Sequence, residues 1–150
     1  MPSSTLDPAR TIAELKELRA LTGDADGAQR VAWTDTWARA RAWMAAKLAE
    51  LPVAVETDQA GNVWATLRGE SERALLIGGH IDSVPNGGWL DGCLNLLAGL
   101  EVLRRLAAEG APPVTVRLVD WAEEAAPASG AASSARAPSR ATWTPRSWPS

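Results

Sequence analysis

Residues 74–82 read Ala-Leu-Leu-Ile-Gly-Gly-His-Ile-Asp, a continuous apolar run followed by two glycines and then by histidine and aspartate. Such a run is typical of a strand that is covered on both faces of a sheet. After it, Asp91 can cap a helix of about 18 residues that Gly110 closes, and residues 114–121 are again rich in valine. A strand, a helix and a second strand in this order predict two parallel neighbouring strands joined by a right-handed crossover.

Two helices are predicted ahead of this unit. Asp7 can accept hydrogen bonds from the first-turn amides of a helix over residues 8–22, which opens on a proline. Thr34 or Asp35 can cap a second helix, which ends before Pro52 because proline cannot continue a helix. The side chains expected on its apolar face are Trp37, Ala40, Met44, Leu48 and Leu51.

A hairpin is predicted between the second helix and the apolar run. Residues 53–57 and 63–67 alternate between apolar and polar side chains, and the segment between them contains Asp58, Gly61 and Asn62. That pattern is typical of two antiparallel strands joined by a short turn. The chain is therefore expected to be an α/β protein, with a partial three-layer sheet of mixed, largely parallel strands and flanking helices.

The composition bounds the size of the protein and its partners. A chain of 150 residues with 46% hydrophobic side chains can form one domain with a core. The net charge of -3 argues against a nucleic-acid partner, which would require a basic stripe, and favours small molecules. The sequence has no signal-type N-terminus and no apolar run of about 18 residues, so we expect a cytoplasmic protein with no membrane partner. The single cysteine, Cys93, is predicted to be a buried thiol rather than a nucleophile.

The last segment, residues 125–150, differs in composition from the rest of the chain. It contains only Ala, Pro, Ser, Gly, Arg, Thr and Trp, and a segment without large aliphatic side chains cannot offset its ordering entropy. All seven residue types have G or C at the second codon position, as expected when a GC-rich gene is read in a shifted frame. We therefore predict a disordered tail and loss of the natural reading frame near Ala125, against the alternative of an ordinary low-complexity linker. DNA sequence across codon 125 tests this prediction.

Five side chains near the predicted strand ends can build a metal site. His80 is the only histidine of the chain, and imidazole and carboxylate are ligands of zinc-type ions. Asp82, two residues further on, can orient the imidazole ring without being a ligand itself. Asp91 can bridge two metal ions. Glu123 and Glu124 would point to opposite sides of an extended backbone, so that one can bind metal while the other acts as general base for a metal-bound water.

Each of these features has a simpler explanation when it is taken alone. A histidine and an aspartate at the end of a strand are more often structural, Asp91 is most simply a helix N-cap, and two adjacent glutamates usually form a solvated face. The combination of all of them in one predicted sheet edge is much more specific. Because ligands of open parallel sheets lie beyond the carboxyl ends of the strands, we expect the five side chains to meet there.

These segments resemble the dinuclear zinc-dependent peptidase and amidase family that contains N-carbamoyl-L-amino-acid hydrolases, beta-ureidopropionase and allantoate amidohydrolase. The resemblance covers residues 8–124, and the Pro-Asn-Gly-Gly insert is similar to the carbamoylase branch. The tail also resembles the family after its glutamate pair when it is read back in the other frame, where residues 129–138 permit Phe-Gly-Arg-Ser-Leu-Phe-Gly-Ser-Ser-Ala. The matching segments are Gly79-His80-Ile81-Asp82-Ser83-Val84-Pro85-Asn86-Gly87-Gly88, Leu90-Asp91-Gly92, Leu97-Ala98-Gly99-Leu100-Glu101 and Asp120-Trp121-Ala122-Glu123-Glu124.

The resemblance implies a role for each site residue. His80 would bind one metal, Asp91 would bridge, Glu123 would be the base with Asp82 supporting catalysis, and Glu124 would bind the second metal. Relatives often carry an aspartate before the glutamate pair, however. If Glu123 occupies that position, Glu124 is the base and the second-metal ligand is missing.

The resemblance also implies what the chain lacks. Residues 1–124 would be the N-terminal part of a metallopeptidase-like catalytic domain, while two further histidine ligands and a small domain through which the parent enzyme forms a homodimer lie downstream in the family. The parent would use two divalent metal ions, zinc, manganese or cobalt, to cleave linear amide C–N bonds of N-carbamoyl amino acids or ureido acids. We expect the 150-residue chain to be an inactive fragment. The alternatives are an aminopeptidase or deacylase, or a noncatalytic metal-binding module.

Overall fold

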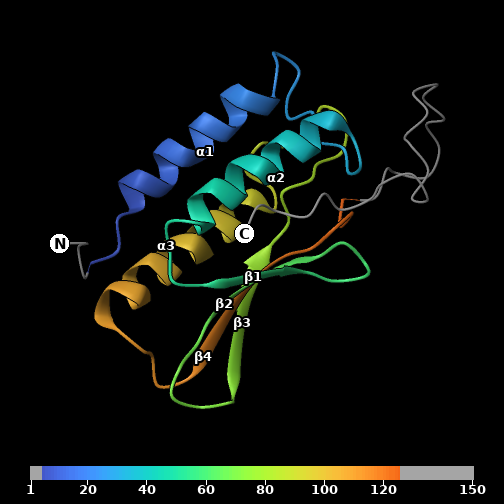
Figure 1. Ribbon diagram of the computed structural model, residues 1–150. Helices are drawn as coiled ribbons and strands as arrows, with labels where there is room; N and C mark the ends of the chain where they lie inside the picture. Colours follow the sequence, from blue (N-terminus) through green and yellow to red (C-terminus); the bar gives the residue numbers. More distant parts are fainter. Residues whose placement is uncertain (1–4, 126–150) are drawn as a thin grey trace.

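Three helices and four strands make up the described part of the chain (Figure 1). The computed structural model describes residues 5–125, and the predicted tail lies outside them except for Ala125. The α/β class with flanking helices is confirmed. The elements are α1 Pro8–Thr22, α2 Asp35–Leu48, β1 Ala54–Thr57, β2 Val63–Leu67, β3 Ala74–Gly79, α3 Cys93–Glu109 and β4 Thr115–Asp120.

The caps of the first two helices are the predicted ones. The Asp7 carboxylate accepts a hydrogen bond from the Arg10 amide, and the Thr34 hydroxyl accepts one from the Trp37 amide. The second helix ends at Leu48, earlier than its predicted apolar face, and a turn leads to Pro52. No helix within residues 5–125 is both long and apolar enough to cross a membrane.

The strands form one sheet in the order β1-β2-β4-β3. Strands β3 and β4 are parallel neighbours, as the crossover pattern predicted, and β1 and β2 form the predicted antiparallel hairpin. Strand β2 pairs with β4 in the antiparallel direction. Among the described strands, parallel pairing is therefore the minority, and the expectation of a largely parallel sheet is wrong because the hairpin inserts next to β4 with β2 reversed.

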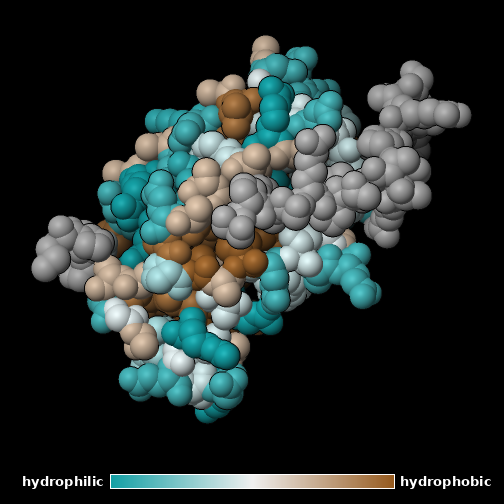
Figure 2. All heavy atoms as spheres, in the orientation of Figure 1, coloured by the Kyte–Doolittle hydropathy of each residue, from teal (hydrophilic) through white to brown (hydrophobic). Residues whose placement is uncertain are grey.

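All three helices lie on one face of the sheet (Figure 1). Helix α3 packs directly on β3 and β4, while α1 packs on α2 and α3. The contact between α3 and the sheet is close, because a Cβ at Gly99 would lie 2.6 Å from the Leu118 side chain. Apolar side chains gather between the helices and the sheet (Figure 2). The expected three-layer arrangement is thus represented by helices on one face only within residues 5–125.

Strand β3 is at the edge of the sheet, which corrects the prediction that its apolar run is covered on both faces. Leu75 is 56% exposed and Leu76 is 53% exposed. Two causes combine: within residues 5–125 no helix covers the second face of the sheet, and β3 has a neighbouring strand on one side only. An apolar edge of this kind favours aggregation.

Candidate metal centre

Candidate ligands meet where the parallel pair of strands ends. His80 follows directly after β3, and Glu124 lies four residues beyond Asp120, the last residue of β4. The Trp121 amide donates to the Gly79 carbonyl at 2.9 Å and keeps the two chain segments together past the end of the ladder. The carboxyl ends of β3 and β4 therefore form one edge of the sheet, as expected for a site in a parallel pair.

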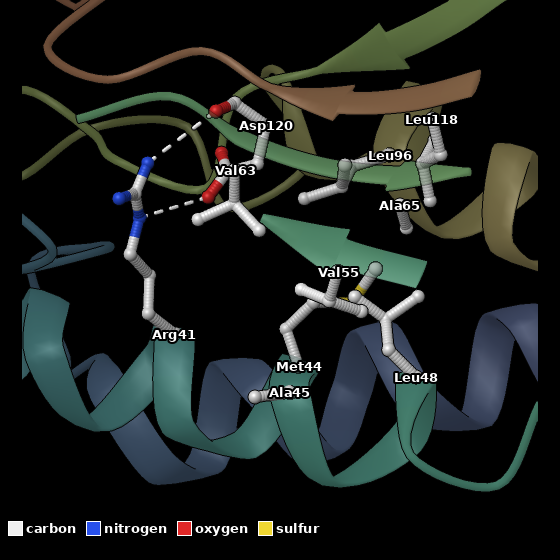
Figure 3. Close-up of a pocket in the computed structure, with 10 residues that line it drawn as sticks. All are labelled: Arg41, Met44, Ala45, Leu48, Val55, Val63, Ala65, Leu96, Leu118 and Asp120. Carbon is white, nitrogen blue, oxygen red and sulfur yellow. Dashed lines mark hydrogen bonds and ion pairs between the residues drawn. The ribbon is translucent and has the colours of Figure 1, made fainter. Parts of the chain in front are cut away.

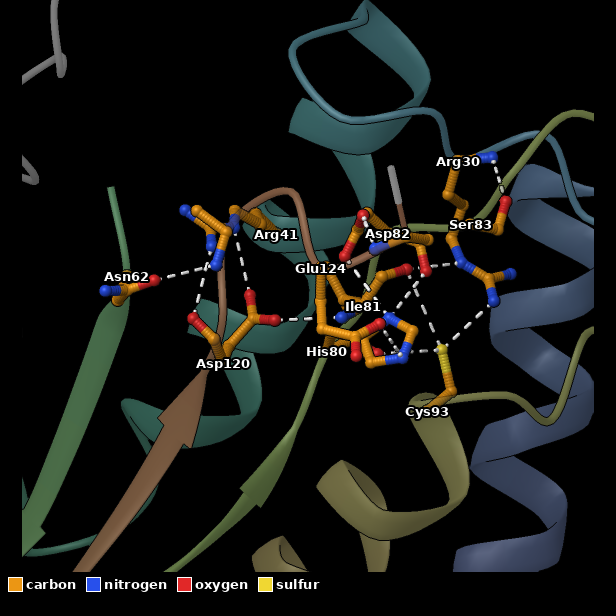
Figure 4. Close-up of polar contacts among 12 residues, drawn as sticks. Arg30, Arg41, Asn62, His80, Ile81, Asp82, Ser83, Cys93, Asp120 and Glu124 are labelled. Carbon is orange, nitrogen blue, oxygen red and sulfur yellow. Dashed lines mark hydrogen bonds and ion pairs between the residues drawn. The ribbon is translucent and has the colours of Figure 1, made fainter. Parts of the chain in front are cut away.

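The imidazole of His80 lies between two carboxylates (Figure 4). Its Nδ1 atom is 3.1 Å from the Asp82 carbonyl oxygen and 3.3 Å from Asp82 Oδ1. Its Nε2 atom is 3.1 Å from Glu124 Oε2. His80 and Asp82 are buried, whereas the Glu124 side chain is 55% exposed. This geometry fixes the ring through Nδ1 and directs Nε2 toward solvent and Glu124.

The electrostatics of His80 favour the protonated ring in the absence of metal. The hydrogen bond from the ring to the Asp82 carboxylate raises the pKa of His80 to about 9, against the opposing effect of burial, and the Glu124 charge adds to the rise. A metal ion needs the deprotonated nitrogen, so it would have to displace this proton. Asp82 is also engaged on its other side, where Oδ2 accepts a hydrogen bond from the Ala125 amide at 3.0 Å.

Asp91 does not cap helix α3, so the prediction that Asp91 is its N-cap is wrong. The N-cap of α3 is Gly92, with φ of 66° and no side-chain capping bond. A Cβ at Gly92 would lie 2.4 Å from His80 Nε2, so the Gly92 backbone lies directly against the ring. The adjacent Asp91 is exposed, and its carboxylate has no hydrogen-bond or ion-pair partner within residues 5–125. This leaves Asp91 available as a ligand.

Glu123 and Glu124 were predicted to point to opposite sides of an extended backbone. The backbone is not extended there, so this prediction is wrong. Ala122 and Glu123 form a turn, and Glu123 has a left-handed φ of 55°. Left-handed backbone in a residue other than glycine costs about 1–3 kcal/mol and is concentrated at functional sites. Because of this turn, the Glu124 side chain lies against His80, and the preceding Glu123 is half-buried.

The donor set suits a zinc-type ion in chemistry but is incomplete in number. An imidazole nitrogen and a carboxylate oxygen face each other at His80 and Glu124, with the Asp82 Oδ1 atom buried behind the ring. Within residues 5–125, however, no three side chains of His, Cys, Asp or Glu converge closely enough to hold a metal ion. His80 and Glu124 fit one metal as a pair, and the remaining ligands would have to come from movement of Asp91 or from elsewhere.

A cavity between α2 and the sheet is too small to hold an amino-acid substrate (Figure 3). Its volume is about 20 Å³, little more than one water needs. Its walls are mostly apolar, apart from Arg41 and Asp120 at one end. The cavity is a packing defect of the core, and the candidate site lies at the strand ends instead.

Cys93 is the buried thiol that was predicted. Burial raises the pKa of Cys93 to about 11, although the nearby Arg30 guanidinium opposes this rise. Sequence reasoning missed three other residues around the site, namely Arg30, Arg41 and Asn62. The contacts that place them at the site join distant parts of the chain, with separations of 51 positions for Arg30 and Ile81, 20 for Arg41 and Gly61, and 60 for Asn62 and Ala122, and no local pattern marks them.

Comparison with known proteins decides the family. The family-wide profile described as Peptidase family M28 matches residues 62–146. The chain belongs to peptidase family M28. The match includes the strand ends that carry His80, Asp91 and the glutamate pair, and the family is metal-dependent. It also reaches past Glu124, where the change of reading frame stays a prediction.

Individual proteins with similar sequences carry amidohydrolase names. The N-carbamoyl-L-amino acid amidohydrolase of Geobacillus stearothermophilus is 37% identical over 86 residues, which are 56% of this chain and 21% of the relative. The allantoate amidohydrolase of Bacillus subtilis (strain 168) is 32% identical over 101 residues, 65% of this chain and 24% of the relative. The chain thus spans less than a quarter of the length of these relatives, and the resemblance stated from the motifs is confirmed.

Solved structures of the same branch share the fold. A hydantoinase/carbamoylase family amidase from Burkholderia ambifaria matches with a TM-score of 0.75 and 32% identity, over 79% of this chain and 30% of that chain. A second such amidase, from Burkholderia phymatum, matches with a TM-score of 0.71 and 34% identity, over 80% of this chain and 30% of that chain. The mixed sheet and its helices therefore share the fold of these hydantoinase/carbamoylase family amidases.

Replacing Gly92 with alanine should disturb the site directly. Both Gly92 and Gly110 have positive φ angles, of 66° and 105°, so alanine at either position is expected to cost about 1–3 kcal/mol of stability. Only Gly92→Ala places a Cβ against His80, whereas nothing lies within 4 Å at Gly110. We expect Gly92→Ala to shift the NMR signals of the single histidine and Gly110→Ala to leave them in place. Equal shifts in both variants would contradict the contact.

Proposed function

We propose that the protein from which this chain derives is a metal-dependent amidohydrolase that cleaves a linear amide C–N bond in an N-carbamoyl amino acid or a ureido acid. The observation that carries the proposal is the His80, Asp82 and Glu124 cluster at the carboxyl ends of β3 and β4. The amidohydrolase names of the relatives supply the substrate class. Such a site would use two divalent ions, with zinc, manganese and cobalt all compatible with nitrogen and oxygen ligands.

Each residue of the cluster has a defined task in this proposal. His80 and Glu124 would hold metal, Asp91 would bridge, and Asp82 would keep the His80 ring in the orientation that exposes Nε2. Bound metal would polarise the substrate carbonyl and lower the pKa of a water molecule. Glu123 would accept the proton of that water and deliver it to the leaving nitrogen. If Glu123 instead fills the position of the aspartate that precedes the pair in relatives, Glu124 takes the part of the base.

The 150-residue chain itself is proposed to be inactive. The structure brings together two candidate metal ligands, His80 and Glu124, whereas catalysis needs a complete, preorganised set of ligands. The proposal therefore divides the chain into residues 1–124, which belong to the catalytic domain, and residues 125–150, read in a shifted frame. The parent is proposed to be a cytoplasmic homodimer acting on a small molecule, with its dimerisation domain supplied by later residues.

The test compares the 150-residue chain with the product of the gene in which the frame is restored after codon 124. We expect the restored protein to release ammonia from N-carbamoyl amino acids in a metal-dependent reaction, and the short chain to release none. Glu123→Gln and Glu124→Gln in the restored protein identify the base as the variant that loses turnover while still binding metal. Absence of an open frame beyond codon 150, or a restored protein that cleaves peptides but no carbamoyl compound, would overturn the proposal.

The family description favours one second candidate. A match to a peptidase family allows an aminopeptidase or deacylase. Ammonia release from amino-acid amides would identify an aminopeptidase, and release of the free amino acid from N-acyl amino acids would identify a deacylase. For a noncatalytic metal-binding module, zinc would bind the 150-residue chain tightly, in stoichiometric amount and with a large rise in thermal stability. We expect weak binding, because His80 and Glu124 alone offer two ligands.

A further inference from the structure

The backbone of Ile81, between His80 and Asp82, is held by buried groups at both its amide and its carbonyl (Figure 4). Ile81 separates His80 from Asp82, and its side chain is fully buried. Its amide donates a hydrogen bond to Asp120 Oδ1 at 2.8 Å. Its carbonyl accepts one from the Arg30 Nε atom at 2.7 Å. Rotation of this residue would turn the His80 ring and the Asp82 carboxylate together, so these two bonds determine where both side chains point.

Arg30 is an unusual residue to find in this position. It is fully buried, yet within residues 5–125 it forms no ion pair with a carboxylate. Its other guanidinium nitrogens donate to the Thr22 hydroxyl at 3.1 Å and to the Cys93 sulfur at 3.0 Å. A buried cation without a counter-ion is expensive, and apolar side chains of similar volume usually serve stability better. Its presence next to the candidate site therefore calls for a role other than packing.

The backbone of Arg30 is attached to the same loop. The Arg30 amide donates to the Ser83 hydroxyl at 3.0 Å, and the Ser83 amide donates to the Arg30 carbonyl at 2.9 Å. Together with the side-chain bond to Ile81, these contacts fasten three consecutive residues that begin at Ile81. Residues before α2 thus hold the loop that follows β3, although 51 positions separate Arg30 from Ile81 and 53 separate it from Ser83.

Asp120 is held equally firmly on the opposite side. Its Oδ2 atom lies 2.9 Å from Arg41 Nε, and both side chains are nearly buried. Arg41 also donates to the carbonyl oxygens of Gly61 and Asp120. Asn62, next to Gly61, accepts a hydrogen bond from the Ala122 amide at 2.8 Å, just before the glutamate pair. The carboxylate that receives the Ile81 amide is therefore itself fixed by α2.

We propose that Arg30 and Asp120 are positioning residues of the metal site. Arg30 binds the Ile81 carbonyl and Asp120 binds the Ile81 amide, and together they set the direction of the His80 and Asp82 side chains. This inference rests on the proposed function for its purpose. The two hydrogen bonds to Ile81 are present in the chain without metal. We expect loss of either bond to alter the His80 environment far more than the overall fold.

The experiment uses the 150-residue chain and its single histidine, whose ring signals are unambiguous in NMR spectra. Arg30→Met removes the carbonyl donor and Arg30→Lys keeps the charge but not the fork of donors. Asp120→Ala removes the acceptor of the Ile81 amide. Arg104→Met is the matched control, because Arg104 is a largely buried arginine that pairs with Glu14 on the other side of α3.

For Arg30→Met we expect exchange of the Ile81 amide to accelerate by about tenfold or more relative to the amides of β2 and β4, with displaced His80 signals. Arg30→Lys should also accelerate Ile81 amide exchange and displace the His80 signals, by smaller amounts. This variant replaces Arg30→Met in the test if the methionine variant does not fold. Arg104→Met should change exchange evenly and leave His80 in place. Unchanged Ile81 exchange and His80 signals in folded Arg30 and Asp120 variants would overturn the inference.

The same variants in the frame-restored protein separate this inference from the proposed function. If the restored protein binds zinc, Arg30→Met should weaken the affinity, whereas Arg104→Met should not. If the restored protein proves to have no amidohydrolase activity, the exchange and NMR results in the short chain still decide whether the two hydrogen bonds to Ile81 exist. Zinc affinity that is equal in Arg30→Met and the parent would refute the positioning role even where the hydrogen bonds are confirmed.

Discussion

Arg41→Leu is expected to lower the free energy of unfolding by about 3–5 kcal/mol, because it leaves a buried carboxylate without its cation. The Arg41 and Asp120 side chains are only 6% and 5% exposed and lie 2.9 Å apart. Burial already raises the pKa of Asp120 to about 6, although the Arg41 charge opposes the rise. Without Arg41, the carboxylate would have to be protonated or solvated, and the Gly61 carbonyl would lose its donor. Equilibrium unfolding in urea measures the loss.

Two further variants isolate the cause of this loss. Arg68→Leu removes an arginine whose pair with Glu72 is 74% and 93% exposed, so a change of no more than about 1 kcal/mol is expected. In the double variant Arg41→Leu with Asp120→Leu no charge remains buried, and part of the stability should return. A double variant that is no more stable than Arg41→Leu would show that packing on Trp37, over which Arg41 lies at 4.3 Å, is the main contribution instead.

Asp82→Asn is expected to lower the pKa of His80 from about 9 toward the ordinary value of 6.5, a large change for a single substitution. The side-chain hydrogen bond to Asp82 is the largest cause of the raised pKa. Since the pKa in the folded chain lies above that of the unfolded chain, protonation of His80 stabilises the fold. That contribution is complete below pH 6.5 and is lost as the pH rises through about 9. The asparagine variant should not show this loss.

The measurement is an NMR titration of the single histidine in metal-free protein, together with urea unfolding at several pH values between 6 and 10. Glu124→Gln is the companion variant, because Glu124 touches the other ring nitrogen but is 55% exposed and should contribute less to the pKa. Should His80 titrate near pH 9 in the Asp82→Asn variant as well, the Asp82 contact would not be the source of the raised pKa.

Local patterns were sufficient for the first two helices and for the hairpin. Asp7 and Thr34 cap their helices through bonds to amides three residues away, and the turn after β1 closes through Asp58 and Asn62. Such contacts depend on neighbours in the chain. The apolar run of β3 was recognised as a strand for the same reason, but its burial was not, because the order of strands depends on pairing between distant segments.

In the candidate site, too, the sequence predicted the contacts between near neighbours and the folded chain revealed the rest. The contact between His80 and Asp82 spans two residues and follows from the backbone alone. The Gly92 N-cap was missed because a capping carboxylate at Asp91 is the commoner arrangement. Only the folded chain could show that the Gly92 backbone fills the space against His80.

The sequence by itself determined the helices and the hairpin, since each is encoded by side chains within a few positions of one another. The crossover followed from the order of strand, helix and strand along the chain, and the residues with metal chemistry followed from their side-chain types. The tertiary structure decided that β3 is an edge strand, that Glu124 reaches His80, and that Arg30 and Asp120 hold Ile81 between them. These arrangements join segments that lie far apart in the chain. Their geometry is set by the packing of α2 and α3 on the sheet, for which no short stretch of sequence holds the information.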